Sequence, residues 1–133
     1  AGFVSLVRLQ KNIQTTYTLP KTVPYNSYAL SGSWMIGDKY SMPTKGATLV
    51  HSYDAAEVYL VMRPKTDGKT AKIKVYLDNK LVTAEAGEDV KDGMVTVDEN
   101  RLYRLIKLST PGAHTIKLEF LDDNAELYAF TFG

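Results

Sequence analysis

Apolar and polar residues alternate with a period of two along most of the chain. In the segment 72–78, KIKVYLD, the residues Ile73, Val75 and Leu77 alternate with lysines and a tyrosine. The segment 114–121 repeats this alternation. Such a pattern is typical of a strand with one face on the core and the other toward solvent. No segment of helical length has apolar residues at helical spacing, so the pattern predicts an all-β protein.

Short polar segments separate the predicted strands. Asp78-Asn79, Asp92-Gly93, Asp98-Glu99-Asn100 and Asp122-Asp123-Asn124 are expected to be turns, because Asp, Asn and Gly tolerate left-handed or locally bonded backbone. Pro111-Gly112 is expected to end one strand and open the next. The remaining strands are predicted at 28–36, 48–53, 57–63, 94–97, 102–108 and 125–132. Strands at this short, regular spacing predict an antiparallel β-sandwich or jelly roll.

The first 25 residues differ from the rest of the chain. Edge strands are expected near 3–7 and 17–19, but Pro20 and Pro24 interrupt any regular ladder because proline lacks an N–H donor. We therefore expect residues 1–25 to form an N-terminal strap or linker packed on the body. Residues 26–133 are expected to form a single β-sandwich module.

Length and composition limit the possible functions. The 133 residues suit one domain, with 44% hydrophobic and 23% charged residues and a net charge of +1. This charge gives no field for steering nucleic acid. No apolar run reaches membrane-spanning length and no signal peptide is recognisable, so the module is not expected to insert into a membrane. The chain begins at Ala1-Gly2, so we expect it to be part of a longer protein.

Catalytic and metal-binding motifs are missing from the sequence. There is no cysteine, and the two histidines, His51 and His114, lack metal-ligand spacing, so both are expected to be structural or surface residues. No G-x-S-x-G motif occurs. Gly68-Lys69-Thr70 is similar to the end of a phosphate-binding loop, but Arg63 stands where the first glycine is required. We predict a hairpin turn there, and no catalytic residue, cofactor or metal ligand in the chain.

Acidic residues cluster in two places. Their oxygens suit calcium, as in loops of many jelly-roll modules, but neither cluster matches an EF-hand. We favour a turn-forming role for them, with structural calcium as the alternative. The residues are Glu85, Glu88, Asp89, Asp92, Asp122 and Asp123.

Tyrosine is the aromatic residue that dominates the chain. Nine tyrosines stand against four phenylalanines and one tryptophan. A tyrosine ring offers an apolar face for stacking on a sugar and a polar tip, whereas planar polar side chains bond sugar hydroxyls. The alternative is that these rings pack at the sandwich rim or against another domain. The candidate ligand-binding residues are Tyr59, Tyr76, Tyr103, Arg63, Lys74, Lys117 and Glu119.

The three candidate tyrosines are predicted to lie opposite core residues. Tyr59, Tyr76 and Tyr103 should face away from Leu60, Val75 and Leu102, respectively. Tyr103 is the first choice for the binding face, and Arg104 then lies on the opposite face of the same strand, beneath it or at the rim. A glycosidase is a third hypothesis, since it needs two carboxylates flanking one cleft, and Glu57 and Glu119 are the strand-borne glutamates to test.

Several segments together resemble one protein family. They are PYNSYALSGSW (24–34), AAEVYLVM (55–62), KVYLD (74–78), EDVKDGMVTVDENRLYRL (88–105), GAHTIKLEF (112–120) and YAFTFG (128–133). In their order and spacing they are similar to the C-terminal module of DipZ-type proteins, which act in cytochrome c biogenesis and thiol–disulfide interchange. The match spans about the last four-fifths of the chain.

The resemblance implies a jelly roll of the galactose-binding-like, carbohydrate-binding-module type, located outside the cytoplasm beside a thioredoxin-like domain. The family's redox chemistry belongs to cysteines of other domains. The leading hypothesis is a non-catalytic accessory module that binds a glycan; the alternative is a module that docks on and orients the thioredoxin-like domain or its substrate. A concave groove with rings and polar groups favours the first, and a flat patch continuous with residues 3–9 favours the second.

Overall fold

The structure, a computed structural model, describes residues 2–4 and 9–133. These residues form strands, turns and irregular segments, with no helix and therefore none that could cross a membrane. The strands are β1 (Gly2–Phe3), β2 (Thr15–Tyr17), β3 (Ser27–Ile36), β4 (Ser41–Pro43), β5 (Thr48–Pro64), β6 (Ala71–Leu77), β7 (Lys80–Leu81), β8 (Val90–Lys91), β9 (Met94–Val97), β10 (Arg101–Phe120) and β11 (Ala125–Phe132).

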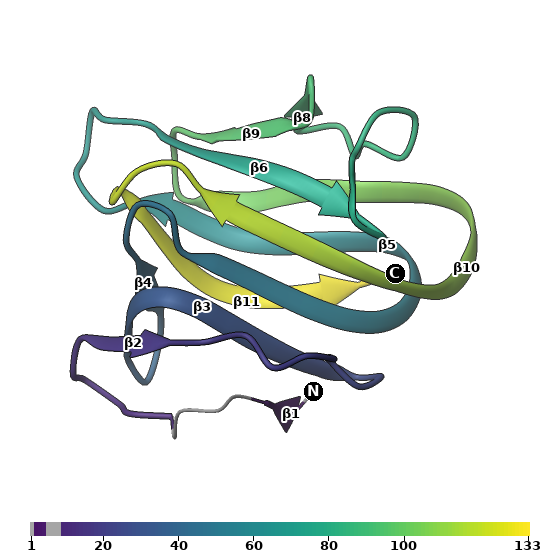
Figure 1. Ribbon diagram of the computed structural model, residues 1–133. Coiled ribbons are helices and arrows are strands. Elements are labelled where there is room, and N and C mark those ends of the chain that lie inside the picture. The colour runs from purple at the N-terminus through teal and green to yellow at the C-terminus, as the bar shows by residue number, and fades with distance from the viewer. Residues whose placement is uncertain (1, 5–8) are drawn as a thin grey trace.

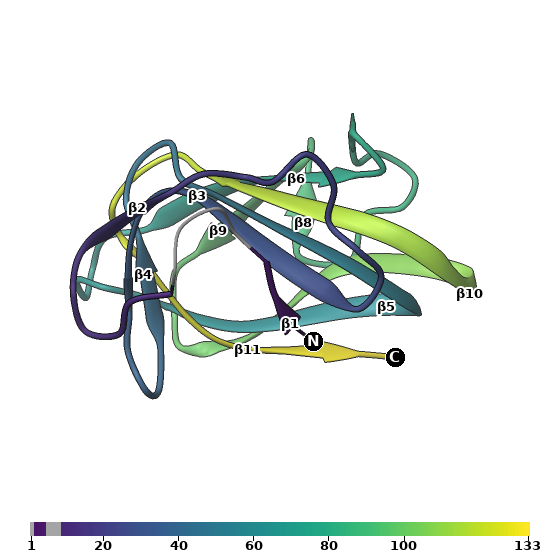
Figure 2. The same ribbon diagram turned by 60° about the horizontal axis from the view of Figure 1, so that its bottom comes forward.

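Two long strands, β5 and β10, organise the fold. They pair antiparallel from Met62 opposite Arg101 to Thr48 opposite Glu119, with register shifts in the middle. Each strand bends there and contributes to both layers of the molecule (Figures 1 and 2). We call the first layer sheet I; its order is β3, β5 (48–55), β10 (112–120), β6, β9 and β8. Sheet II contains β4, β11, β5 (57–64) and β10 (101–107). This confirms the antiparallel β-sandwich of jelly-roll type.

Most predicted strands and turns are confirmed, but two predicted breaks are wrong. β9 and β11 have the predicted bounds, and β6 differs by one residue at each end. The predicted breaks at 54–56 and at Pro111-Gly112 instead lie inside β5 and β10. The β10 register shifts between Lys107 and Gly112, so the extra residues bulge out while the strand continues into the other layer.

Two tight hairpins border sheet I as the sequence predicts. Asp78 and Asn79 have φ of 51° and 67°, and Asp92 and Gly93 have φ of 54° and 75°. Two consecutive positive φ values are the signature of the type I′ turn, whose twist matches that of paired strands. At Gly93 a Cβ would also overlap the Leu81 side chain. These turns fix the registers of β6–β7 and β8–β9.

The core lies between the two sheets. Trp34 and Phe120 meet edge to face at 5.4 Å between ring centroids, and both are buried. The indole Nε1 of Trp34 donates to the Ser31 carbonyl at 2.9 Å. Ile73, Val75 and Leu77 are buried, as the alternation predicts. The opposite residues of β6 therefore face solvent on the outer side of sheet I.

The segment 19–23 crosses the outer side of sheet I. It borders a groove together with residues of β5 and β10, and the Ser52 hydroxyl donates to the Val23 carbonyl at 3.0 Å. Nearer the N-terminus, the Phe3 ring packs on Tyr17 and Tyr28, at centroid distances of 5.7 and 5.3 Å. Of the two edge strands predicted there, 3–7 lies partly outside the described residues, and the second is β2, which starts two residues early.

Candidate functional site

Tyr103, the first choice from the sequence for the binding face, is a core residue. It is 0% exposed, whereas Leu102 is 37% exposed, the reverse of the predicted arrangement. The Tyr103 hydroxyl accepts hydrogen bonds from the backbone N–H groups of Asp98 and Glu99 and donates to the Glu99 carbonyl at 2.7 Å. Burial raises the pKa of this hydroxyl, although the backbone donors oppose the shift. Tyr103 therefore holds the 98–100 turn on the sandwich and cannot stack on a ligand.

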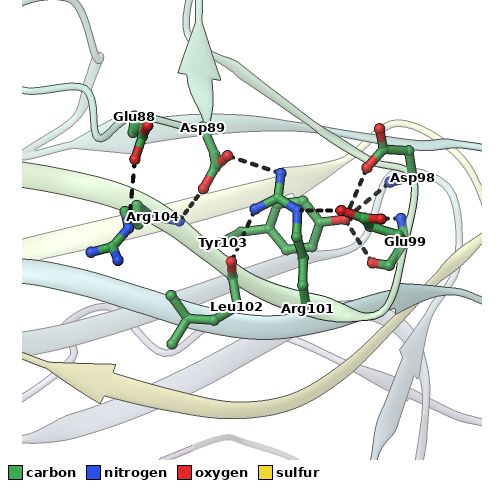
Figure 3. Close-up of polar contacts among 8 residues, drawn as sticks. All are labelled: Glu88, Asp89, Asp98, Glu99, Arg101, Leu102, Tyr103 and Arg104. Atoms are coloured by element: carbon green, nitrogen blue, oxygen red, sulfur yellow. Dashed lines mark hydrogen bonds and ion pairs between the residues drawn. The ribbon is translucent and has the colours of Figure 1, made fainter.

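Charged residues surround Tyr103 (Figure 3). Arg101 lies over the ring, with Cζ 4.0 Å from the centroid, and pairs with Asp89 at 2.9 Å and Glu99 at 3.2 Å. Asp89 also accepts a hydrogen bond from the Arg104 backbone at 2.7 Å. Burial opposes ionisation of Asp89, but the bonds from Arg101 and Arg104 outweigh it and lower its pKa. Asp89, which directly precedes β8, thus anchors its segment of the chain to strand β10.

Tyr59 and Arg63 lie on β5 in sheet II, where the arginines are already paired. Arg104 faces solvent, not the side beneath an exposed Tyr103 as predicted, with Nε 3.6 Å from Glu88 and Cζ 5.4 Å from the Tyr59 ring. Arg63 Nε lies 2.6 Å from Oε1 of Glu126, whose side chain is only 6% exposed. The bond to Glu126 raises the pKa of Arg63. The guanidinium also lies 5.8 Å from the rings of both Tyr40 and Tyr128.

The other four candidate residues meet on the outer face of sheet I. Lys117 pairs with Tyr76 and Glu119 with Lys74 across β10 and β6. The Tyr76 hydroxyl donates to Glu119 Oε1 at 3.2 Å, and Lys117 Nζ lies 5.1 Å from the Tyr76 ring centroid. Partial burial, and then the Glu119 carboxylate, raise the pKa of Tyr76. We call Lys74, Tyr76, Lys117 and Glu119 the Tyr76 cluster.

Two hollows flank the Tyr76 cluster. The strap groove, about 490 Å³, lies between residues 19–23 and the strands, and Lys117 forms part of its wall. It also contains Val50, Ser52, Asp78, Asn79 and Thr115. The edge hollow, about 340 Å³, is lined by Lys72, Asp89, Lys91, Asp92, Met94 and Thr96. The cluster and both hollows form one polar surface across five neighbouring strands of sheet I, which are β5, β10, β6, β9 and β8.

A third hollow, about 350 Å³, opens between the two sheets. It is largely apolar, with the rings of Tyr28, Trp34, Phe130 and Phe132 in its lining. His51 is also in the lining; it is buried, and burial lowers its pKa. Few polar side chains converge here, unlike on the outer face of sheet I. We call this hollow the inter-sheet cavity.

His114 and three acidic residues singled out from the sequence have structural partners. His114 Nδ1 lies 2.7 Å from Asp78 Oδ2, and Asp78 Oδ1 accepts from the Thr115 backbone at 2.9 Å. Asp122 accepts from the backbone of Lys72 and Asn124, and Glu85 from that of Thr83. No group of three or more His, Asp or Glu residues suited to a metal occurs in the described part of the chain.

Sequence reasoning missed the strap residues of the groove. Lys21 and Thr22 reach it because residues 19–23 run along sheet I. Their segment has no alternation, and its contact partners at residues 50–52 and 115–117 are distant in sequence. No local signal in the chain could have paired them.

The comparisons with known proteins agree with this architecture. The family model described as thioredoxin-like C-terminal domain matches residues 1–133. No curated protein matches the chain by sequence. Among solved structures, a family two carbohydrate esterase from Cellvibrio japonicus aligns over 79% of this chain with a TM-score of 0.64 and 15% identity. One from Clostridium thermocellum, in complex with cellohexaose, aligns over 68% with a TM-score of 0.51 and 14% identity. This chain covers only 30% and 25% of those proteins, and the likeness concerns the fold.

Proposed function

The chain belongs to the family of thioredoxin-like C-terminal domains, and from that premise we propose that it is a non-catalytic accessory module that binds a glycan. The observation that carries this proposal is the Tyr76 cluster, a half-buried ring with charged neighbours between two polar hollows. The parent protein would be a DipZ-type thiol–disulfide interchange protein that acts in cytochrome c biogenesis, with this module outside the cytoplasm.

The chemistry of the outer face of sheet I suits sugar binding. The Tyr76 ring offers an apolar face, and Lys74, Lys117 and Glu119 offer donors and acceptors around it. Within the strap groove, Thr22, Asn79 and Thr115 add further polar groups. Sugar sites need this combination of a ring with convergent polar groups. That a structural relative was solved with cellohexaose is in keeping with a glycan ligand on this fold.

The placement of the two candidate glutamates supports a non-catalytic role. Glu119 lies on the outer face of sheet I, bonded to Tyr76. Glu57 lies in the sheet II half of β5, opposite Lys107. A glycosidase needs both carboxylates at one cleft, about 5–10 Å apart. Two glutamates in different layers do not meet this requirement.

A glycan-array screen followed by calorimetric titration tests the proposal. We expect the chain to bind at least one glycan, Tyr76→Ala to abolish binding, and Tyr59→Ala in sheet II to leave it unchanged. Far-ultraviolet circular dichroism confirms that each variant is folded. If no glycan binds, or if binding depends on Tyr59 and not on Tyr76, the proposal is wrong.

Docking on the adjacent thioredoxin-like domain is a second candidate function, favoured by exposed rings beside the inter-sheet cavity. Phe132 is 36% exposed and stacks on Tyr53 at 5.1 Å, and the neighbouring Phe130 and Tyr28 are half-buried. Phe3 extends this aromatic row toward the N-terminus through its contact with Tyr28. Exposed aromatic rows of this kind are common at protein interfaces.

Titration of the module with the parent's thioredoxin-like domain tests docking. Phe132→Ser should weaken the association, whereas Leu102→Ser, which removes a similarly exposed apolar residue of sheet II, should not. Absence of association, or equal effects of the two substitutions, would exclude docking through this row.

A further inference from the structure

The outer face of sheet I carries lysines without counter-ions. Lys72 and Lys74 project from β6 and Lys117 from β10, on the side away from the core. None of the three takes part in an ion pair among the described residues. Lys91, at the edge hollow, has no ion pair in that part of the chain either.

The acidic groups near these lysines have hydrogen-bond or ion-pair partners other than the lysines. Glu119 accepts the hydroxyl hydrogen of Tyr76, and Asp122 accepts backbone N–H groups. Asp89 pairs with Arg101, and Asp78 with His114. Asp92, in the edge hollow, is the remaining carboxylate on this surface. Hydrogen bonds from neutral groups leave these carboxylates charged, but within the Tyr76 cluster and Lys72 three lysines stand against one carboxylate, Glu119. This group of residues therefore has a local excess of positive charge although the whole chain carries only +1.

The lysines are spaced for a ligand with repeated negative charges. Residues two apart on a strand are about 6.8 Å apart, and cross-strand neighbours are about 5 Å apart. Lys72 and Lys74 are two residues apart on β6, whereas Lys117 is the cross-strand neighbour of Tyr76 on β10. Lys117 now covers the Tyr76 ring at 5.1 Å. An anionic group that draws this ammonium aside would expose the ring for stacking.

We propose that the Tyr76 cluster and Lys72 recognise an anionic glycan, a chain of sugars that carries carboxylate or sulfate groups. The ammonium groups neutralise the anions, and Tyr76 stacks on a sugar ring between them. This inference rests on the proposed glycan-binding function and specifies its ligand class.

Calorimetric titration of the full chain with four probes tests this inference. Polygalacturonate supplies carboxylates, chondroitin sulfate supplies sulfates as well, cellohexaose is neutral, and polyglutamate is a polyanion without sugar. We expect an acidic glycan to bind at least about tenfold more tightly than cellohexaose, and more weakly as salt rises. The two acidic glycans together decide which anion is preferred.

A matched pair of triple variants locates the charges. Lys72→Gln/Lys74→Gln/Lys117→Gln should weaken binding of the acidic glycan on the order of tenfold or more. Lys65→Gln/Lys69→Gln/Lys107→Gln removes the same charge from exposed positions elsewhere and should change binding little. Tyr76→Ala should abolish glycan binding in both backgrounds.

The possible failures are distinguishable. Binding of cellohexaose as tight as that of the acidic glycans, unaffected by the first triple variant, overturns the inference and leaves glycan binding intact. If polyglutamate binds as tightly as the acidic glycans and Tyr76→Ala does not weaken its binding, the inference is wrong. The surface then attracts polyanions in general. If neither acidic glycan binds, the inference is wrong; the proposed function is wrong as well only if the glycan array also shows no binding.

Discussion

The outer faces of the two sheets both carry tyrosines beside cations. The cations beside these tyrosines differ in whether they pair with a carboxylate. On sheet II, Arg63 pairs with Glu126 and Arg104 pairs with Glu88. On sheet I the cations are lysines, and those around Tyr76 have no carboxylate partner among the described residues. Arginine's planar fork suits a fixed pair with a carboxylate, whereas a lysine ammonium stays hydrated and mobile. The Arg63–Glu126 pair of sheet II therefore serves the fold, whereas under our proposal the unpaired lysines around Tyr76 serve a ligand.

The largest expected difference is between Tyr103 and Tyr76. Tyr103→Ala removes a buried ring and should lower the free energy of unfolding by about 3–5 kcal/mol. Tyr103→Phe keeps the ring but leaves two backbone N–H groups without their acceptor, at a cost of about 1–2 kcal/mol. Tyr76→Ala should cost about 1 kcal/mol or less. Urea denaturation at neutral pH measures all three.

Equal losses for Tyr103→Ala and Tyr76→Ala would contradict the placement of one tyrosine in the core and the other on the outer face of sheet I. Retention of full stability in Tyr103→Phe would show that the hydroxyl does not hold the 98–100 turn.

The second comparison sets a paired cation against an unpaired one. Arg63→Met leaves the buried Glu126 carboxylate without its partner and should lower the thermal midpoint by several degrees. Lys74→Met, the matched change on sheet I, removes no ion pair and should leave the midpoint nearly unchanged. Differential scanning calorimetry measures both. A midpoint in Arg63→Met equal to that of the unsubstituted chain would mean that the Arg63–Glu126 pair does not stabilise sheet II.

Features of the fold that depend on residues close in sequence could be predicted, and features that depend on distant strands could not. β9 and β11 were predicted with their observed bounds, because alternation and turn residues act within a few positions. The continuity of β5 and β10 through their bends was missed, because it depends on each strand's partner in the other layer. Pro111 is tolerated within β10 since it lies in the stretch where the register shifts.

The error at Tyr103 has a physical cause. A period of two separates Leu102 from Tyr103 but does not say which of them is inside. Leu102 shares its side of the strand with Arg104, but Tyr103 shares its side with Arg101 as well as with the buried Leu105. Charged residues at both parities leave the solvent face unidentified by the sequence. In the same way, the meeting of Lys74 and Tyr76 with Lys117 and Glu119 depends on the β6–β10 register, which the sequence does not specify.

The acid stability of the 89–104 region gives a third, smaller effect. The pKa of Asp89 is lowered in the folded chain by Arg101 and the Arg104 backbone. Its contribution to stability is therefore fully present above the ordinary pKa of about 4, and is lost as the pH falls through the lower folded value. Asp89→Asn should be less stable at neutral pH and lose less stability on acidification.

Urea denaturation between neutral and acid pH measures this effect, with Asp67→Asn in the exposed 65–70 loop as the control. The control should keep the pH dependence of the unsubstituted chain. An unchanged pH dependence in Asp89→Asn would mean that Asp89 does not link the acid sensitivity of the fold to its pairing with Arg101.

The smallest expected effect concerns the hydroxyl pKa values of Tyr59 and Tyr76. Both are raised, but at Tyr59 the main cause is the Glu57 carboxylate, whereas at Tyr76 burial comes before Glu119. A carboxylate disfavours the phenolate, so its removal lowers the tyrosine pKa. Glu57→Gln should therefore lower the pKa of Tyr59 more than Glu119→Gln lowers that of Tyr76, as measured by NMR titration of ring-labelled tyrosines. An equal or larger change at Tyr76 would mean that Glu119 controls the ring more strongly than its partly buried setting does, and a ligand that displaces this carboxylate would then alter the acidity of Tyr76 directly.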